Sequence, residues 1–222
     1  MLLTKFGHSC VRLDADGGRL AIDPGIWSGG DGTDPLAGAG AVLITHEHVD
    51  HLDMSAVHAA LDADGGLELW TNPAVAASFV GYGVRVHAVG HGDRFTAAGF
   101  EVRVHGRDHA QIHPDVPVVQ NVGFAVSGIG PAAGGTVFHP GDSFTIPDGP
   151  VQTLLLPVTA PWLKVSEVVD YARAVGPAMN YAIHDAVANA NGLALIERLA
   201  GLLLGENGGG YARLEPGSSV EV

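Results

Sequence analysis

The chain has little positive charge and almost no sulfur. It contains a single cysteine, Cys10, and only 11 lysines and arginines against 24 acidic residues, for a formal net charge of −13. A single cysteine excludes an internal disulfide and is typical of a reducing compartment. The shortage of basic residues excludes the basic stripe that a nucleic-acid-binding surface requires. Cys10 lies in an alternating segment, which favours a small buried hydrophobic side chain over a nucleophile or a ligand.

Long apolar runs are also missing. No stretch approaches the length that crosses a bilayer, and the N-terminus lacks the pattern of a cleaved signal peptide. We therefore expect a cytoplasmic protein without membrane contacts. Hydrophobic residues make up 46% of the 222 residues and charged residues 16%. These values predict a well-packed globular protein and, at this length, one domain over 1–222.

Short apolar runs punctuated by the 32 glycines dominate the chain and predict many strands joined by tight turns. The expected strands are 2–6, 9–13, 19–23, 41–45, 67–71, 84–89, 100–105, 122–126, 136–139, 151–156 and 179–183, with a hairpin turn at 16–18 and a glycine-rich loop over 28–40. The expected helices are 54–61, a short helix from Pro73, 166–175 capped by Ser166 and ended by Gly176, and 193–204. This order predicts two stacked sheets with helices outside.

The most informative segment follows the apolar run 41–44. It places four ligand-capable side chains within six positions, as His46, His48, Asp50 and His51. His46 and His48 can lie on the same side of the backbone, whereas Asp50 and His51 carry the chain to a second position. Buried imidazoles and a carboxylate each need polar partners, and a divalent cation supplies them. The segment therefore predicts a metal site.

Further ligands are expected where other strands end, because a rigid sheet can hold loop residues in place there. His109, Asp142 and His184 each follow or end a predicted strand. His105 and His113 are alternatives to His109. We prefer His109 because it lies just past the end of its strand.

In this order the residues resemble the metallo-β-lactamase superfamily. The motif His-x-His-x-Asp-His stands here as His46, His48, Asp50 and His51, and the later matches are His109, Asp142 and His184. The resemblance covers essentially the whole chain and implies an α/β fold, the αββα four-layer sandwich. It also implies two divalent metal ions. One would be held by His46, His48 and His109, the other by Asp50, His51 and His184, with Asp142 as the bridge.

Within the superfamily the sequence looks most similar to the UlaG-like branch, which is related to L-ascorbate-6-phosphate lactonase. The segments that carry this similarity are 6–10, 22–25, 112–115 and 138–142. The motif is followed by Leu-Asp at 52–53, where lactamases and glyoxalases usually have a small or glycine pair. This difference disfavours a lactamase or glyoxalase activity.

Other polar and aromatic residues are candidates for orienting a ligand or lining a pocket. These candidates are His8, Asp23, His113 and Trp162. For each of them a structural role, such as capping a turn or packing in the core, is equally compatible with the sequence. The histidines without a partner motif, expected at the surface or in structural roles, are His58, His87 and His91.

Two cations that share a carboxylate lower the pKa of a bridging water and polarise a carbonyl or phosphoryl oxygen. The chain contains no Gly-x-Ser-x-Gly motif that would offer a rival nucleophile. We therefore expect hydrolysis of a small ester, lactone or phosphodiester by metal-bound hydroxide, with Asp50 as proton acceptor and donor. The alternative is a metal-binding regulatory or sensor protein without turnover.

The ligand types suit zinc best, and also manganese, iron, cobalt or nickel. Phosphate recognition requires arginine or lysine in the pocket, and the candidates are Arg12, Arg107 and Lys164. Because basic residues are so few, we expect a small-molecule substrate that is uncharged or modestly anionic. The apolar spacing of the last helix is also compatible with a homo-oligomer.

Overall fold

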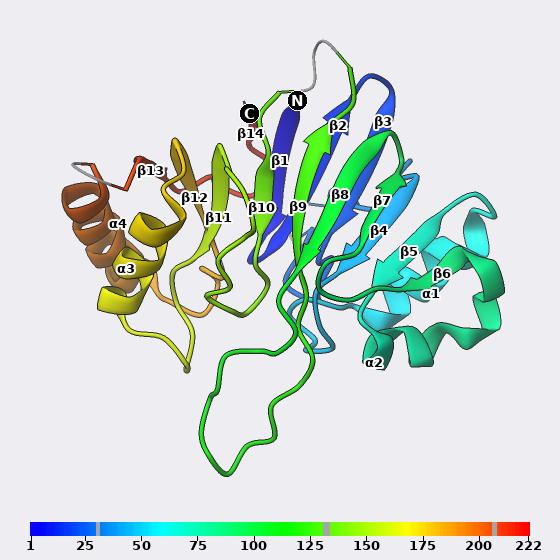
Figure 1. Ribbon diagram of the computed structural model, residues 1–222, viewed down its shortest axis with the longest axis horizontal. Helices are drawn as coiled ribbons and strands as arrows, with labels where there is room; N and C mark the ends of the chain where they lie inside the picture. The colour runs from blue at the N-terminus through cyan, green and yellow to red at the C-terminus, as the bar shows by residue number, and fades with distance from the viewer. Residues whose placement is uncertain (30–31, 131–133, 206–207) are drawn as a thin grey trace.

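A computed structural model of the protein describes residues 1–29, 32–130, 134–205 and 208–222. The described strands form two sheets of seven strands each (Figure 1). The first sheet contains β1 (Leu2–Gly7), β2 (Cys10–Ala15), β3 (Gly18–Ile22), β4 (Ala41–Ile44), β5 (Glu68–Thr71), β6 (Val86–Ala88) and β14 (Ser219–Glu221). The second contains β7 (Arg94–Ala97), β8 (Phe100–His105), β9 (Gly123–Gly128), β10 (Val137–His139), β11 (Thr153–Pro157), β12 (Met179–Ile183) and β13 (Gly210–Ala212).

Helices cover the outer face of each sheet (Figure 1). The first sheet carries α1 (Met54–Ala63), α2 (Pro73–Ala76) and the 3₁₀ helix η1 (Ala77–Arg85), and the second carries α3 (Val165–Val175) and α4 (Ala190–Leu204). Leu195 and Leu202 of α4 are exposed, and the homo-oligomer stays a prediction. Among the described residues no helix is both long enough and apolar enough to span a membrane.

The largest buried cluster lies between the two sheets. Leu13 and Leu43 of the first sheet meet Phe100, Phe124 and Val126 of the second, and all five are fully buried. Burying each such side chain stabilises the fold by roughly 1.5–3 kcal/mol. Two further clusters fill the spaces between each sheet and its helices. The predicted αββα sandwich is therefore confirmed.

Strand direction brings the chemistry to one end of the sandwich. β10, β11 and β12 run parallel, and β8 points the same way because it is antiparallel to β9, which is antiparallel to β10. The C-terminal ends of β8, β10 and β12 therefore lie at the same end of the second sheet. The termini lie together at the opposite end, where β14 pairs with β1, and the long segment between β8 and β9 projects away from them (Figure 1, green).

Most predicted elements are present, and the errors concentrate at the sheet edges. The strand expected over 84–89 is wrong at its start, since η1 continues to Arg85 and only 86–88 form β6. The edge strands β7, β13 and β14 were not predicted. An edge strand is hydrogen-bonded on one side and partly exposed, so its apolar alternation is weak.

One hairpin turn, the start of one helix and one loop remain to be compared with the predicted elements. The hairpin at 16–18 is confirmed, with positive φ at Asp16 and Gly17. Ser166 is not the cap of its helix: α3 begins earlier, and the Lys164 amide donates to the Glu167 carboxylate at 2.8 Å. The glycine-rich loop expected over 28–40 includes residues 30 and 31, which lie outside the described residues.

Candidate metal centre

The turn after β4 is fixed by the residues that end β3. The Asp23 carboxylate accepts hydrogen bonds from the Thr45 amide at 2.8 Å and from the Thr45 hydroxyl at 2.6 Å. Gly25 packs directly against the turn, because a Cβ added there would lie 1.9 Å from the carbonyl oxygen of Asp50. The segment that follows β3 therefore holds the histidine-rich turn after β4 in one shape.

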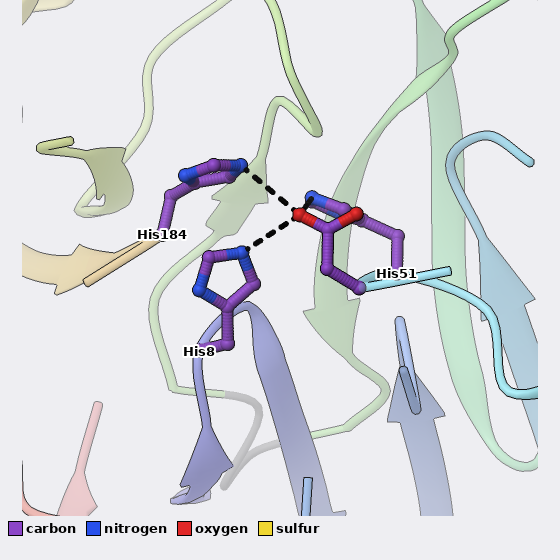
Figure 2. Close-up of side chains that lie close together, drawn as sticks. His8, His51 and His184 are labelled. Atoms are coloured by element: carbon purple, nitrogen blue, oxygen red, sulfur yellow. Dashed lines mark hydrogen bonds and ion pairs between the residues drawn. The ribbon is translucent and has the colours of Figure 1, made fainter. Parts of the chain in front are cut away.

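The ligand-capable side chains converge in two neighbouring groups, and within each group the ligand atoms lie within 4.8 Å of one another. The first group is His46, His48, His109 and Asp142; the second is His8, Asp50, His51 and His184. Figure 2 shows the rings of His8, His51 and His184 turned toward one another.

Asp142 lies between the two groups. Its carboxylate is 3.2 Å from Nε2 of His109, in the first group, and 3.0 Å from Nε2 of both His51 and His184, in the second. The Asp142 amide donates to the Asn121 side-chain oxygen at 3.0 Å, which fixes the backbone of this residue. A single carboxylate is thus within reach of ligands from both groups.

Four of the imidazoles are oriented through Nδ1. The pairs are His46 with the Thr45 hydroxyl at 3.0 Å, His51 with the Asp23 carboxylate at 2.7 Å, His109 with the Ala110 carbonyl at 2.6 Å, and His184 with the Thr159 carbonyl. Each Nδ1–H donates to an oxygen, so each Nε2 is left as the ligand atom. Such partners are what metal-binding histidines usually have. Asp23 therefore orients a candidate ligand, one of the two roles considered from the sequence.

Several of these atoms are buried without a hydrogen-bond partner. They are Nε2 of His51, His109 and His184, and Oδ1 of Asp142. Each buried polar atom left without a hydrogen bond costs about 1–3 kcal/mol. Divalent cations would bind all four, and nitrogen and oxygen donors without thiolate suit zinc and the neighbouring first-row metals. The residues present therefore fit a metal centre.

The electrostatics differ between the imidazoles. Burial lowers the pKa of His46 and of His48, so both are neutral near pH 7. Burial acts in the same direction on His184, but the carboxylates of Asp142 at 3.0 Å and Asp50 at 3.5 Å outweigh it and raise the pKa of His184 to about 9. The pKa of His51 is likewise raised, because the charge of Asp142 overcomes the effect of burial.

We expect metal binding to release protons. In the metal-free protein His51 and His184 are protonated at pH 7.5, and a metal displaces both protons, so loading should release about two. Metal affinity should rise with pH until both imidazoles are neutral in the metal-free protein. Calorimetric zinc titrations in buffers of different ionisation enthalpy measure the release. A binding enthalpy that is independent of the buffer would contradict the prediction.

His8 and Asp50 form a hydrogen-bonded pair beside the second group. His8 Nδ1 accepts from the Ala186 amide at 3.3 Å, so Nε2 carries the proton and donates to Asp50 at 3.1 Å. Partial burial alone would raise the pKa of Asp50, but the His184 ring at 3.5 Å and the hydrogen bond from His8 hold it well below its usual range. His8 thus orients Asp50, which is ionised at neutral pH.

Backbone strain gathers at the same place. Five described non-glycine residues have positive φ, and three of them are His8, Asp23 and His184. Each such conformation costs on the order of 1–3 kcal/mol and is common at functional sites. The fold maintains this strain where the candidate ligands converge.

Not every candidate joins the groups. His113 is mostly exposed, and its carboxylate partner is Asp115 at 3.5 Å. His105 lies on the outer face of the second sheet, where it forms a separate group with His91 and Asp148. Neither alternative to His109 is therefore near the centre. The two remaining histidines have structural contacts: His58 with the Tyr82 hydroxyl at 2.8 Å, and His87 stacked on Trp70.

Three buried residues near the candidate ligands have contacts that the sequence alone does not predict. His139 Nε2 donates to the Ser9 carbonyl at 2.9 Å, and Asn121 holds Asp142. The Lys5 ammonium crosses from β1 to the second sheet and donates to Asp185 at 2.6 Å. Asn121 and His139 adjoin predicted strand ends, which is a weak signal. Lys5 offered no signal at all, because its partner lies 180 positions away.

A cavity of 230 Å³ opens over both groups. Its polar wall consists of His48, Asp50, His109, Asp142 and His184, and its apolar wall of Trp27, Ile112, Pro161, Trp162 and Val187. Trp162 Nε1 donates to Asp142 at 3.0 Å, so the candidate pocket residue does reach the centre. A separate cavity of 420 Å³ contains Arg107 and none of the seven candidate ligands.

The chain is similar to known proteins over most of its length. The family model of the beta-lactamase superfamily domain matches residues 2–184. The protein Rv0786c of Mycobacterium tuberculosis is 40% identical over 84% of this chain and 85% of its own. A UPF0173 metal-dependent hydrolase of Bacillus pumilus is 26% identical over 76% of this chain and 84% of its own.

Solved structures share the architecture at low sequence identity. The metallo-beta-lactamase fold protein YhfI of Bacillus subtilis has a TM-score of 0.74 at 17% identity and covers 100% of this chain and 99% of its own. Igni18, a metallo hydrolase of Ignicoccus hospitalis, has a TM-score of 0.71 at 20% identity, covering 100% and 97%. Fold, domain match and relatives agree: the chain belongs to the metallo-β-lactamase superfamily.

Proposed function

We propose that the protein is a metal-dependent hydrolase with a binuclear centre. His46, His48 and His109 would hold one cation, Asp50, His51 and His184 the other, and Asp142 would bind both. The observation that carries the proposal is the set of buried, unpartnered ligand atoms that converge on Asp142. Zinc fits this donor set best, and manganese, iron, cobalt and nickel are the other candidates.

When bound, two cations lower the pKa of a water and polarise the oxygen of a carbonyl or phosphoryl group. The residues of the chain supply the rest. Asp50 faces the cavity as an ionised carboxylate, so it can accept a proton from the attacking water and pass it to the leaving group. His8 keeps Asp50 in position through its hydrogen bond at 3.1 Å.

The substrate is expected to be a small ester, lactone or phosphodiester. The names of two similar proteins, a UPF0173 metal-dependent hydrolase and an isothiocyanate hydrolase from Delia radicum gut bacteria, support hydrolysis as the reaction type. Placement in the UlaG-like branch rests on the four sequence segments that resemble it, and it favours a lactone. A cavity of 230 Å³ is below the roughly 300–1,000 Å³ of pockets for drug-sized ligands.

Metal removal tests the proposal. Protein stripped with a chelator should lose hydrolysis of a panel of lactones, aryl esters, phosphodiesters and thioesters, because the attacking water is no longer activated. Two equivalents of Zn²⁺ or Mn²⁺ should restore it. Metal analysis and turnover are measured on the same samples. Two bound equivalents without hydrolysis of any compound would favour the alternative, a metal-binding sensor, and would overturn the enzyme assignment.

A further inference from the structure

The wall of the cavity that faces away from the metal ligands is apolar. Trp27, Ile112 and Val187 are large hydrophobic residues that are 45%, 37% and 48% exposed. Large hydrophobic side chains that stay exposed together commonly mark a binding surface. Here they surround the entrance to the candidate ligands, so the surface and the metal centre form one site.

The apolar wall is built from four separate parts of the chain. Trp27 follows β3, Ile112 lies between β8 and β9, Trp162 precedes α3, and Val187 follows β12. The two indoles are anchored on the centre itself. Trp27 packs edge-on against His8 with ring centroids 4.9 Å apart, and Trp162 donates to Asp142. The positions of the two indoles relative to the ligands are therefore fixed.

No lysine or arginine lines this cavity in the part of the chain that the structure describes. The basic residues considered for phosphate binding lie outside this cavity or are paired with acidic residues. Arg12 pairs with Asp14 at 2.9 Å, Lys164 is exposed beside Glu167, and Arg107 lies in the separate cavity. An anionic group at a distance from the metal ions would lose water and gain no charged partner.

We propose that the site takes small substrates whose acyl or aryl part is apolar and uncharged, held by Trp27, Ile112, Trp162 and Val187. This inference rests on the proposed hydrolase function and names its substrate class. It excludes substrates that carry a second phosphate or carboxylate remote from the bond that is cleaved. It accordingly separates this chain from a lactonase of phosphorylated sugars, although the sequence resembles that branch.

A matched pair of probes tests the substrate class. 4-Nitrophenyl hexanoate and mono-4-nitrophenyl adipate share a leaving group and a six-carbon acyl chain, and only the adipate carries a remote carboxylate. With zinc-loaded protein we expect kcat/KM for the hexanoate to exceed that for the adipate by at least about tenfold. Bis(4-nitrophenyl) phosphate serves as the phosphodiester arm and should be hydrolysed most slowly relative to its uncatalysed rate.

Binding without turnover provides an independent measurement. Hexanamide and adipamate replace the esters by unreactive amides, and tryptophan fluorescence follows their binding at Trp27 and Trp162. The Ile112→Lys variant places a cation in the apolar wall and should reduce the preference for the neutral ligand about tenfold. Val84→Lys is the matched control, since it adds the same charge at a residue that is 90% exposed and outside the cavity. Its preference should equal that of the unmodified protein.

The two proposals fail in different ways. Hydrolysis with equal or higher kcat/KM for the adipate would overturn the apolar site and leave the hydrolase intact. Preferential binding of hexanamide without hydrolysis of any ester would support the apolar site and overturn the hydrolase. Absence of binding by either amide would overturn the apolar site, as would an Ile112→Lys variant whose preference is unchanged.

Discussion

Replacement of Asp142 by alanine is expected to reduce hydrolysis by at least about a thousandfold, equivalent to about 4 kcal/mol of transition-state stabilisation. The reason is its central place, with His51, His109 and His184 all within 3.2 Å of its carboxylate. The charge of Asp142 is also the main cause that raises the pKa of His51, so this pKa should fall in the variant. The site thus loses a metal ligand and a negative charge. Metal content and turnover should fall together.

Two further variants serve as comparisons for the metal content and turnover of Asp142→Ala. Asp50→Ala should abolish turnover but keep about one metal, because the three histidines around the other position are untouched. Asp148→Ala removes an exposed carboxylate from the separate group on the outer face of the second sheet and should change neither metal content nor turnover. A folded Asp142→Ala protein with two metals and normal turnover would contradict the binuclear assignment.

The sequence predicts the local part of the centre better than the distant part. The histidine-rich turn could be recognised alone, since its four side chains lie within six positions. His109, Asp142 and His184 needed the strand ends and the family resemblance, because nothing in their local sequence links them. His113 shows the limit of such reasoning: it lies four positions after His109, yet the projecting segment carries it into solvent.

The residues that no pattern could supply are those whose partners lie across the sandwich. Trp27 and Val187 line the same cavity although 160 positions separate them in the sequence, and neither carries a charged or metal-ligating group that would suggest a site. The edge strands β7, β13 and β14 have the same explanation. Their pairing partners, more than their own composition, make them strands.

Contacts between the sheets gather at the metal end. The His139 ring donates to the Ser9 carbonyl, and the His184 amide donates to the His8 carbonyl at 3.2 Å. Lys5 adds a charged contact, since its ammonium reaches the Ala182 carbonyl at 2.9 Å and the Asp185 carboxylate at 2.6 Å. These contacts connect the first sheet to the backbone on both sides of His184, a candidate ligand.

Lys5→Met is therefore expected to destabilise the metal-free protein by about 3–5 kcal/mol, because it leaves the buried Asp185 carboxylate without its closest cation. Arg213 lies 3.7 Å from the same carboxylate and still neutralises part of its charge. The loss of unfolding free energy should therefore be near the lower end of this range. Urea unfolding followed by circular dichroism measures the change. Zinc affinity of the second group should fall as well, since Asp185 follows His184 directly.

Two comparisons separate the pair from a general effect of losing a lysine. Lys164→Met removes an exposed lysine whose ammonium is 3.5 Å from the Glu167 carboxylate. The free energy of unfolding of this variant should match that of the unmodified protein, because exposed ion pairs contribute little. Lys5→Met combined with Asp185→Asn removes the unpaired charge and should recover part of the lost stability. If Lys5→Met alone leaves both unfolding and zinc affinity unchanged, the buried pair does not hold the two sheets together at the metal end. If stability falls and zinc affinity stays constant, the pair supports the fold without positioning His184.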